Sequence, residues 1–323
     1  MKRVSKKKFY NRLNELIGQY SVYAPCGDKI EEIKDVSELS IDGLLTRLPS
    51  KTYMFPQNEE LFRWDKGKKI EVNIPDRKSI LFGIRPCDAR AIATFDPTFD
   101  TEEFPDPYFQ KRRKNTIIIS MGCNEPEETC FCTSFGSGPF DASGSDLLLV
   151  EMEKDFLGIG REEILELFGF EEGKGEKDFE EIKTQAEKKV EKINLKGIKE
   201  KLDALRETNF FKEISNKCIN CGACTFLCPT CYCFDIEDME RVDGGKRMRN
   251  WDSCMFKIYT YETSGNNPRR QEELRMQQRI MHKFNYYPLL YDMYGCVGCG
   301  RCVSYCPVNF DIREIIKLIN NAN

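Results

Sequence analysis

Sixteen cysteines stand in this chain of 323 residues, and eight of them form two copies of one pattern. In each copy, two residues lie between the first and second cysteines and two between the second and third. Three further residues precede a fourth cysteine, which is directly followed by a proline. The copies are Cys218, Cys221, Cys224 and Cys228 with Pro229, and Cys296, Cys299, Cys302 and Cys306 with Pro307. Thiols at such close and regular spacing are typical of metal ligands.

The repeated spacing favours iron–sulfur clusters over zinc. It is the bacterial ferredoxin pattern for a 4Fe-4S cluster, in which the fourth cysteine of a run ligates the other cluster of the pair. A zinc site needs only four ligands and would not repeat a fourth cysteine before proline. We therefore assign Cys218, Cys221, Cys224 and Cys306 to cluster 1, and Cys296, Cys299, Cys302 and Cys228 to cluster 2. The small residues Gly222, Ala223, Gly298 and Gly300 are expected to let the backbone approach the sulfides.

A third group of cysteines is less regular. The stretch GCNEPEETCFC contains Cys123, Cys130 and Cys132, and Cys87 follows another apolar run. These four thiols are a candidate third cluster site, and the Gly/Ser-rich residues 134–139 offer backbone N–H groups to cluster sulfur. Two alternatives are open, namely thiol exchange by Cys130 and Cys132, or buried structural thiols. Cys26, Cys231, Cys233 and Cys254 are left over, and core packing is expected for them, with tuning of a nearby cluster as the alternative.

The elements that position these cysteines differ between the two parts of the chain. Apolar, β-type runs at 79–84, 116–120 and 146–152 predict an α/β or α+β body over residues 1–205, with Cys87 and Cys123 at strand carboxyl ends, where ligands bind. A Lys/Glu-rich, amphipathic segment over 177–205 predicts a helical connector. Residues 206–323 are expected to form an α-helical dicluster ferredoxin domain, including a helix that starts at Asn267–Pro268. The lone His282 on that helix is expected to be a surface or core residue.

Composition excludes several classes of function. Lys and Arg (49) nearly balance Asp and Glu (53), for a formal charge of −4, which argues against nucleic acid as the main partner. There is no signal-peptide pattern and no run of about 18 apolar residues, so we expect a cytoplasmic protein without a membrane span. No G-x-G-x-x-G or P-loop motif marks a nucleotide site, and a single histidine argues against triad chemistry.

Together with both ferredoxin motifs, four stretches carry a family resemblance: KTYMFPQNEELFRW, FGIRPCDARAI, DPYFQKRR and GCNEPEETCFCTSFGSGP. The chain resembles the iron–sulfur subunit shared by cytoplasmic sulfhydrogenases, where it is the beta subunit, and by anaerobic sulfite reductases. The resemblance implies an electron-transfer subunit, not the catalytic one. Its implied partners are a flavoprotein subunit that handles NAD(P)H or ferredoxin, and a catalytic subunit of hydrogenase or sulfite reductase type.

Two other functions remain open. In an iron–sulfur scaffold or redox sensor, the clusters would be delivered or would regulate. A labile site with too few ligands would indicate such a protein, but both ferredoxin motifs here are complete. A self-sufficient reductase would need a flavin, for which the sequence has no fingerprint. Four basic residues, Lys51, Arg85, Arg112 and Arg113, are candidates to face a partner or a cluster's negative charge, with plain solvation as the alternative.

Overall fold

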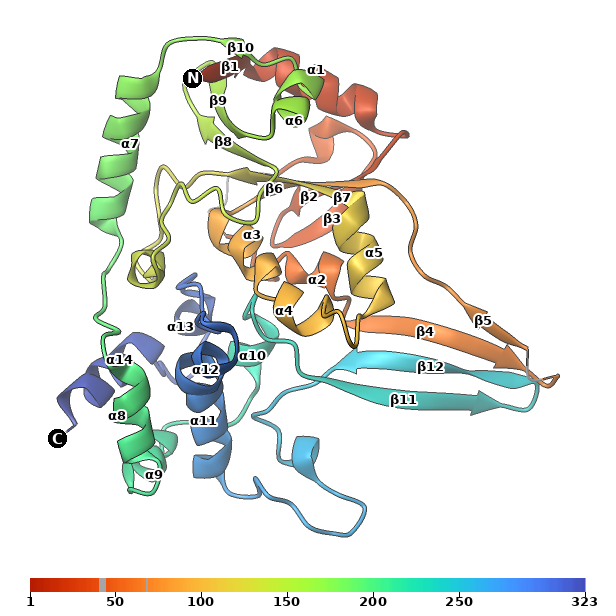
Figure 1. Ribbon diagram of the computed structural model, residues 1–323, viewed down its shortest axis with the longest axis vertical. Helices are drawn as coiled ribbons and strands as arrows, with labels where there is room; N and C mark the ends of the chain where they lie inside the picture. Colours follow the sequence, from red (N-terminus) through yellow and green to blue (C-terminus); the bar gives the residue numbers. More distant parts are fainter. Residues whose placement is uncertain (41–44, 68, 323) are drawn as a thin grey trace. The chain divides into compact units, whose positions relative to one another are not determined.

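The computed structural model describes residues 1–40, 45–67 and 69–322, and they form two compact units. Unit 1 comprises 1–54, 75–192 and 297–300, and unit 2 comprises 55–74, 193–296 and 301–323. The sequence predicted a single boundary near residue 205. By contacts the chain divides at several points, because a strand from the first hundred residues pairs with a strand near residue 250 (Figure 1). In addition, residues 297–300 group with the N-terminal body.

Unit 1 is built on an eight-stranded mixed sheet. Its order is β10 (Glu171–Glu172), β1 (Lys2–Ser5), β9 (Asp155–Gly160), β8 (Leu147–Glu151), β7 (Thr116–Met121), β6 (Ser79–Ile84), β2 (Ser21–Cys26) and β3 (Lys29–Ile33). The four central strands, β8, β7, β6 and β2, run parallel, and the outer ones pair antiparallel. The three strands expected from apolar runs are β6, β7 and β8, which confirms those predictions.

Helices bury both faces of this sheet, which explains why its central strands read as continuous apolar runs. All six residues of β6 are buried. On one face, Phe9 of α1 (Lys6–Leu16) stacks on Phe168 with ring centroids 4.6 Å apart and also contacts Phe82. Elsewhere in the unit, Phe179 of α7 packs edge-on against Phe140. The other helices are α2 (Lys51–Met54), α3 (Pro86–Ala93), α4 (Asp96–Phe99), α5 (Pro107–Asn115), α6 (Glu162–Leu167) and α7 (Glu176–Lys189).

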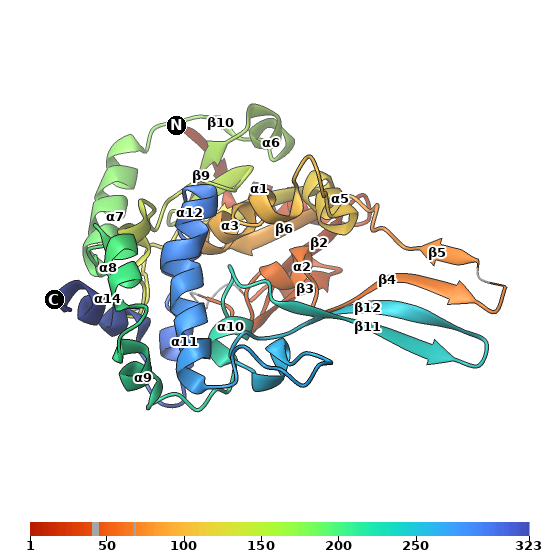
Figure 2. The same cartoon turned by 60° about the horizontal axis from the view of Figure 1, so that its bottom comes forward.

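Unit 2 contains a four-stranded antiparallel sheet that the sequence did not predict (Figure 2). Its order is β11 (Phe234–Arg241), β12 (Gly244–Trp251), β4 (Asn58–Asp65) and β5 (Ile70–Val72). A buried ion pair joins Arg249 of β12 to Glu59 of β4, and the Arg249 guanidinium also lies 4.8 Å from the centre of the Phe55 ring. The region expected to be α-helical is therefore mixed.

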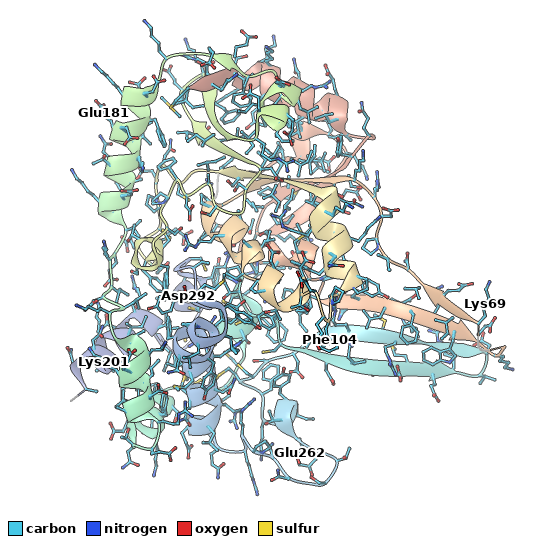
Figure 3. The ribbon with its side chains drawn as sticks, viewed as in Figure 1. Lys69, Phe104, Glu181, Lys201, Glu262 and Asp292 are labelled. Carbon is cyan, nitrogen blue, oxygen red and sulfur yellow. The ribbon has the colours of Figure 1, made fainter. Side chains whose placement is uncertain are left out.

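Two helices of unit 2 carry cysteines of the ferredoxin motifs, Cys224 and Cys302. The helices of this unit are α8 (Ile198–Leu205), α9 (Phe210–Ser215), α10 (Ala223–Phe226), α11 (Glu272–Met281), α12 (Tyr287–Tyr291), α13 (Arg301–Ser304) and α14 (Ile312–Asn321). The predicted connector is confirmed as helix in α7 and α8, which carry Glu181 and Lys201, labelled in Figure 3. None of the helices in the described ranges is long and apolar enough to cross a membrane.

The helix expected from Asn267–Pro268 begins later, at Glu272, with Gln271 as its N-cap. Asn267 is engaged elsewhere: its Oδ1 accepts from Arg269 N–H at 3.1 Å and from Thr260 Oγ1 at 2.8 Å, so it closes a turn and does not cap a helix. After α11 the helix widens into one π-helical turn, η4 (His282–Tyr286). Such turns occur frequently at functional sites.

Candidate metal centres

Two of the predicted third-cluster ligands lie at the carboxyl edge of the unit 1 sheet. β6 and β7 run parallel, with Ile84 opposite Ser120, so the residues that follow both strands emerge at the same edge. Cys87 lies in the first turn of α3, after β6, and Cys123 follows β7 by two residues. The sheet topology thus brings together two cysteines that are far apart in sequence.

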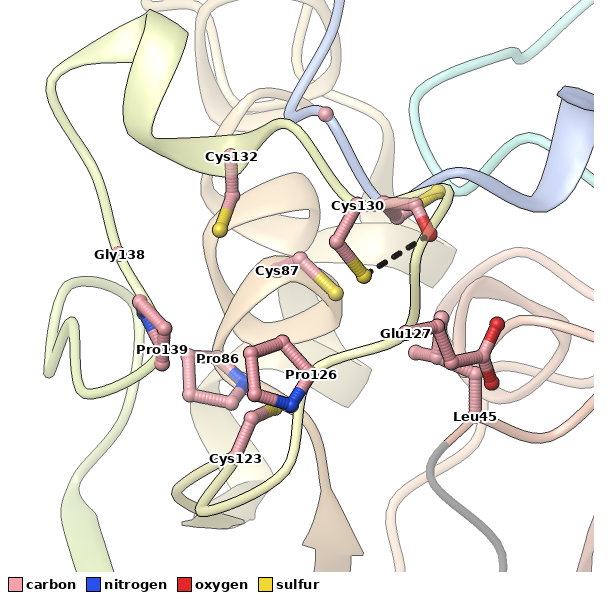
Figure 4. Close-up of a pocket in the computed structure, with 12 residues that line it drawn as sticks. Leu45, Pro86, Cys87, Cys123, Pro126, Glu127, Cys130, Cys132, Gly138 and Pro139 are labelled. Carbon is pink, nitrogen blue, oxygen red and sulfur yellow. Dashed lines mark hydrogen bonds between the residues drawn. The ribbon is translucent and has the colours of Figure 1, made fainter. Parts of the chain in front are cut away.

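All four predicted ligands of the third cluster line one pocket of unit 1 (Figure 4). A fifth cysteine, Cys299, lines it too. We call these residues the thiol pocket: Cys87, Cys123, Cys130, Cys132 and Cys299. Pro86, Pro126 and Pro139 contribute apolar walls. Cys299 comes from residues 297–300 of the second ferredoxin motif, so sequence spacing assigned it to cluster 2 and gave no sign of this position.

Backbone contacts hold residues 297–300 against the Cys130–Cys132 segment. The Phe131 N–H donates to Gly298 O at 2.8 Å, and Cys130 Sγ lies 4.0 Å from Cys299 O. Gly298 has φ +66°, and a Cβ there would lie 2.5 Å from Phe131 C. Glycine at this position therefore admits protein backbone, a role additional to the predicted approach to cluster sulfides.

The thiols of this pocket are hard to ionise without a metal. Burial, and then the neighbouring Cys123, raise the pKa of Cys132 to about 12. Burial, Cys123 and Cys132 likewise raise the pKa of Cys130. The described lining residues include no Lys or Arg to stabilise a thiolate. Ionised thiolates here would therefore need positive charge from a bound ligand, which a metal could supply.

A cluster differs from a single ion in how widely its ligands are spread. Within the described ranges, no three His, Cys, Asp or Glu side chains converge as ligands of one metal ion. A cube spreads its four thiolates around a larger core, which suits five thiols around one apolar pocket.

The first ferredoxin motif forms a tight loop in unit 2. Asn220, at φ +54°, donates its backbone N–H to Cys218 Sγ at 3.4 Å. Burial raises the pKa of Cys218, and the hydrogen bond from this N–H group partly offsets that increase. After the loop, Thr225 of α10 bonds Ser253 at 2.7 Å. Hydrogen bonds of N–H to sulfur are among the features that tune cluster potentials.

A buried lysine links the end of the first motif to the start of the second. Lys283 Nζ donates to Cys228 Sγ at 3.2 Å, to Thr230 Oγ1 at 3.2 Å and to Gly295 O at 2.8 Å. Gly295 directly precedes Cys296, so Cys228 lies beside the second motif. Burial lowers the pKa of Lys283, but the charges of Cys228 and further cysteines outweigh burial and raise it.

The remaining cysteines fall into two kinds. Cys233 hydrogen-bonds with Cys254, which together with burial raises the pKa of Cys254, and Cys231 lies close by. These leftover thiols thus gather in unit 2, beside residues of the first motif. Cys26 instead packs at the edge of the unit 1 core, with Sγ 3.5 Å from Glu38 O. Cys306, the last cysteine of the second motif, accepts from Phe310 N–H at 3.1 Å.

The singled-out basic residues have structural contacts within unit 1. Arg85 Nη1 donates to Gly122 O at 3.0 Å, Arg112 Nη1 donates to Met54 O at 3.5 Å, and Lys51 is buried. Arg113 lines a polar pocket and counteracts the raised pKa of the half-buried Asp96. His282 of unit 2 is mostly buried beside Tyr232 and Tyr287. Of the two expected positions, surface or core, it thus occupies the core.

Comparisons with known proteins support the ferredoxin motifs. A family model described as a 4Fe-4S dicluster domain matches residues 217–310. The Sulfhydrogenase 2 subunit beta of Pyrococcus furiosus is 33% identical over 98% of this chain and 96% of its own length. No solved structure gives a significant match. The chain belongs to the family of the sulfhydrogenase beta subunits, iron–sulfur proteins with a 4Fe-4S dicluster domain.

Proposed function

We propose that this chain is the electron-transfer subunit of a multi-subunit anaerobic oxidoreductase. It relays electrons between a flavoprotein subunit that handles NAD(P)H or ferredoxin and a catalytic subunit of hydrogenase or sulfite reductase type. The similar protein from Pyrococcus furiosus bears the name of a sulfhydrogenase subunit, which supports a role inside such a complex. The sixteen cysteines, none of which forms a disulfide in the described part of the chain, support a reducing location, which we infer to be the cytoplasm.

One observation carries this proposal: three groups of cysteines, each sufficient for a cluster, occur in one chain. Cluster 1 is assigned to Cys218, Cys221, Cys224 and Cys306, cluster 2 to Cys296, Cys299, Cys302 and Cys228, and cluster 3 to Cys87, Cys123, Cys130 and Cys132. The contact of Lys283 with both Cys228 and Gly295 supports the crosswise assignment of Cys228. When bound, a 4Fe-4S cluster takes up or releases one electron at a time.

The chain's own contribution is to bind, bury and tune. Thiols supply the ligands, and backbone N–H groups, such as those of Asn220 and Phe310, donate to ligand sulfur. Burial in apolar surroundings restricts water and so affects the potential. The fifth thiol, Cys299, lies in the pocket assigned to cluster 3 while it belongs by spacing to cluster 2. Replacing it is therefore expected to affect both of those clusters.

The test uses the full-length chain purified without oxygen. We expect about twelve irons per chain, reduction by dithionite, and no oxidation of NAD(P)H by the chain alone. A native pull-down is expected to recover a flavoprotein and a catalytic oxidoreductase subunit. Rapid transfer of clusters to an iron-free acceptor protein would instead indicate a scaffold, and bound flavin would indicate a self-sufficient reductase.

A further inference from the structure

Three cations on one helical face of unit 2 are almost wholly buried. Arg275, Arg279 and Lys283 are 4%, 3% and 4% exposed, and they follow one another at intervals of four residues along α11 and η4. Residues four apart lie on the same face of a helix. We call these three residues the buried cation row. A buried cation without a counter-charge is costly, so its surroundings indicate its purpose.

The three cations differ in their partners. Arg275 Nη1 donates to the backbone oxygens of Arg269 and Arg270, at 3.1 and 2.7 Å. Lys283 binds a thiol, a hydroxyl and a carbonyl oxygen. Arg279, by contrast, has no hydrogen-bond partner in the described part of the chain for either Nε or Nη1, whereas Arg275 lacks one only for Nε. Two donors of a buried guanidinium are thus available to a group that the protein itself does not provide.

The surroundings of Arg279 and Lys283 are rich in thiols and not in carboxylates. The thiols whose ionised forms attract Arg279 are those of Cys224, Cys302, Cys231 and Cys228. The thiols whose ionised forms attract Lys283 are those of Cys228, Cys231 and Cys296. Among the described residues, neither cation forms an ion pair with Asp or Glu. Arg279 therefore lies among cysteines assigned to both ferredoxin clusters, and Lys283 lies among cysteines assigned to cluster 2.

We infer that Arg279 and Lys283 set the reduction potentials of the two ferredoxin clusters, by donating N–H groups to cluster sulfur and by placing fixed positive charge beside it. This inference rests on the proposed function. Reduction adds negative charge to a site already made anionic by four thiolates, and a buried cation stabilises the added charge. Both residues therefore raise the potentials, Arg279 for both clusters and Lys283 chiefly for cluster 2. They position charge and ligate no iron.

The same geometry has the opposite consequence for the metal-free chain. Without thiolate ligands to iron, the buried cations lose their counter-charge and destabilise the fold. Neutralising Arg279 is therefore expected to lower cluster potentials in the loaded protein and to raise the melting temperature of the metal-free protein. A merely structural arginine would not produce these two opposite effects.

The experiment compares variants of the full-length chain, loaded with iron and sulfide without oxygen. Redox titration monitored by electron paramagnetic resonance is expected to show more negative midpoint potentials for both ferredoxin clusters in Arg279→Gln, and mainly for one cluster in Lys283→Gln. The charge-conserving variants Arg279→Lys and Lys283→Arg are expected to stay near the wild type. Arg275→Gln is the matched control, because Arg275 shares the helix face and the burial but binds backbone carbonyls, and its potentials are expected not to shift.

The outcomes separate this inference from the proposed function. Full cluster signals with unchanged potentials in Arg279→Gln and Lys283→Gln would overturn the inference alone. A wild-type chain without cluster signals would overturn the proposed function and the inference with it. If Arg279→Gln fails to take up iron, the potentials of Lys283→Gln and Lys283→Arg decide the question. A metal-free Arg279→Gln chain that melts below the wild type would also contradict the inference.

Discussion

The thiol pocket of unit 1 and the cysteines near Arg279 and Lys283 in unit 2 offer the same candidate ligand, a thiol, in different electrostatic surroundings. The described residues that line the thiol pocket include no Lys or Arg, and burial together with neighbouring thiols raises the pKa of Cys132 to about 12. In unit 2, Lys283 Nζ lies 3.2 Å from Cys228 Sγ, and Arg279 is buried among four cysteines. In the first region a bound metal alone would compensate thiolate charge, and in the second the protein would share that task.

This difference teaches that cysteine spacing does not determine how a cluster site is stabilised. A thiol without a nearby cation stays protonated until a metal arrives, so metal binding there releases protons. A site with built-in positive charge favours the reduced form of a bound cluster. We therefore expect the pocket of unit 1 to hold the cluster with the lower potential, other factors being equal.

The largest expected effect concerns the independence of the two regions. Cys130→Ala should remove about four irons per chain while the two ferredoxin clusters stay, because a cube that loses one of four thiolates exposes an iron to water. Iron analysis and electron paramagnetic resonance of the full-length chain measure this. Cys26→Ala, at a half-buried thiol outside the pocket, is the control and should keep all irons. A wild-type chain with only about eight irons and a freely reactive Cys130 would disprove the third cluster.

A second prediction contrasts buried cations of two kinds within unit 2. Glu59→Gln leaves Arg249, 3% exposed, without its carboxylate and should cost about 3–5 kcal/mol of unfolding free energy. Neutralising Arg279 in the metal-free chain should instead stabilise it, since that cation has no carboxylate to lose. Denaturant melts of both metal-free variants measure the contrast. Replacing Glu59 and Arg249 together by apolar residues should recover most of the loss, and equal destabilisation by Glu59→Gln and Arg279→Gln would refute the distinction.

The third prediction tests how residues 297–300 are held in the thiol pocket. Gly298→Ala should cost about 3 kcal/mol, because the residue has a left-handed conformation and its Cβ would press on the backbone of Phe131 and Cys132. Gly136→Ala is the matched control, with φ +65° and nothing within 4 Å of a Cβ, and it should cost about 1 kcal/mol. Anaerobic thermal melts compare the two. Equal losses would mean that the loop contact contributes nothing.

The smallest effect concerns His282, the one histidine of the chain. Burial, followed by the positive charge of Lys283, lowers its pKa to about 4. Below about pH 6.5, the unfolded chain takes up a proton at His282 whereas the folded chain does not. The free energy of unfolding therefore decreases as the pH is lowered from 6.5 to 4. We expect a loss of about 1 kcal/mol from pH 6.5 to 5.5. The loss should be absent in His282→Gln and smaller in Lys283→Met, and an identical pH profile in all three proteins would contradict this account.

Local pattern alone sufficed for several features. The apolar runs predicted β6, β7 and β8, because strands buried on both faces need continuous apolar sequence. The amphipathic spacing predicted α7 and α8. The dicluster motif followed from cysteine spacing, because its first three ligands come from one short loop. Features whose partners are close in sequence can be read from sequence.

Tertiary structure decided the features whose partners are far apart. The pairing of β4 with β12 joins residues near 60 to residues near 245, and no local signal announces such a contact. Cys299 enters the thiol pocket because Gly298 admits the backbone of Phe131, which spacing cannot show. The sequence predicted a helix in this region but not the burial of its three cations, because burial depends on which elements pack over a helix face. Sequence thus determined which thiols this protein offers as candidate ligands, and the fold determined the charges that surround them.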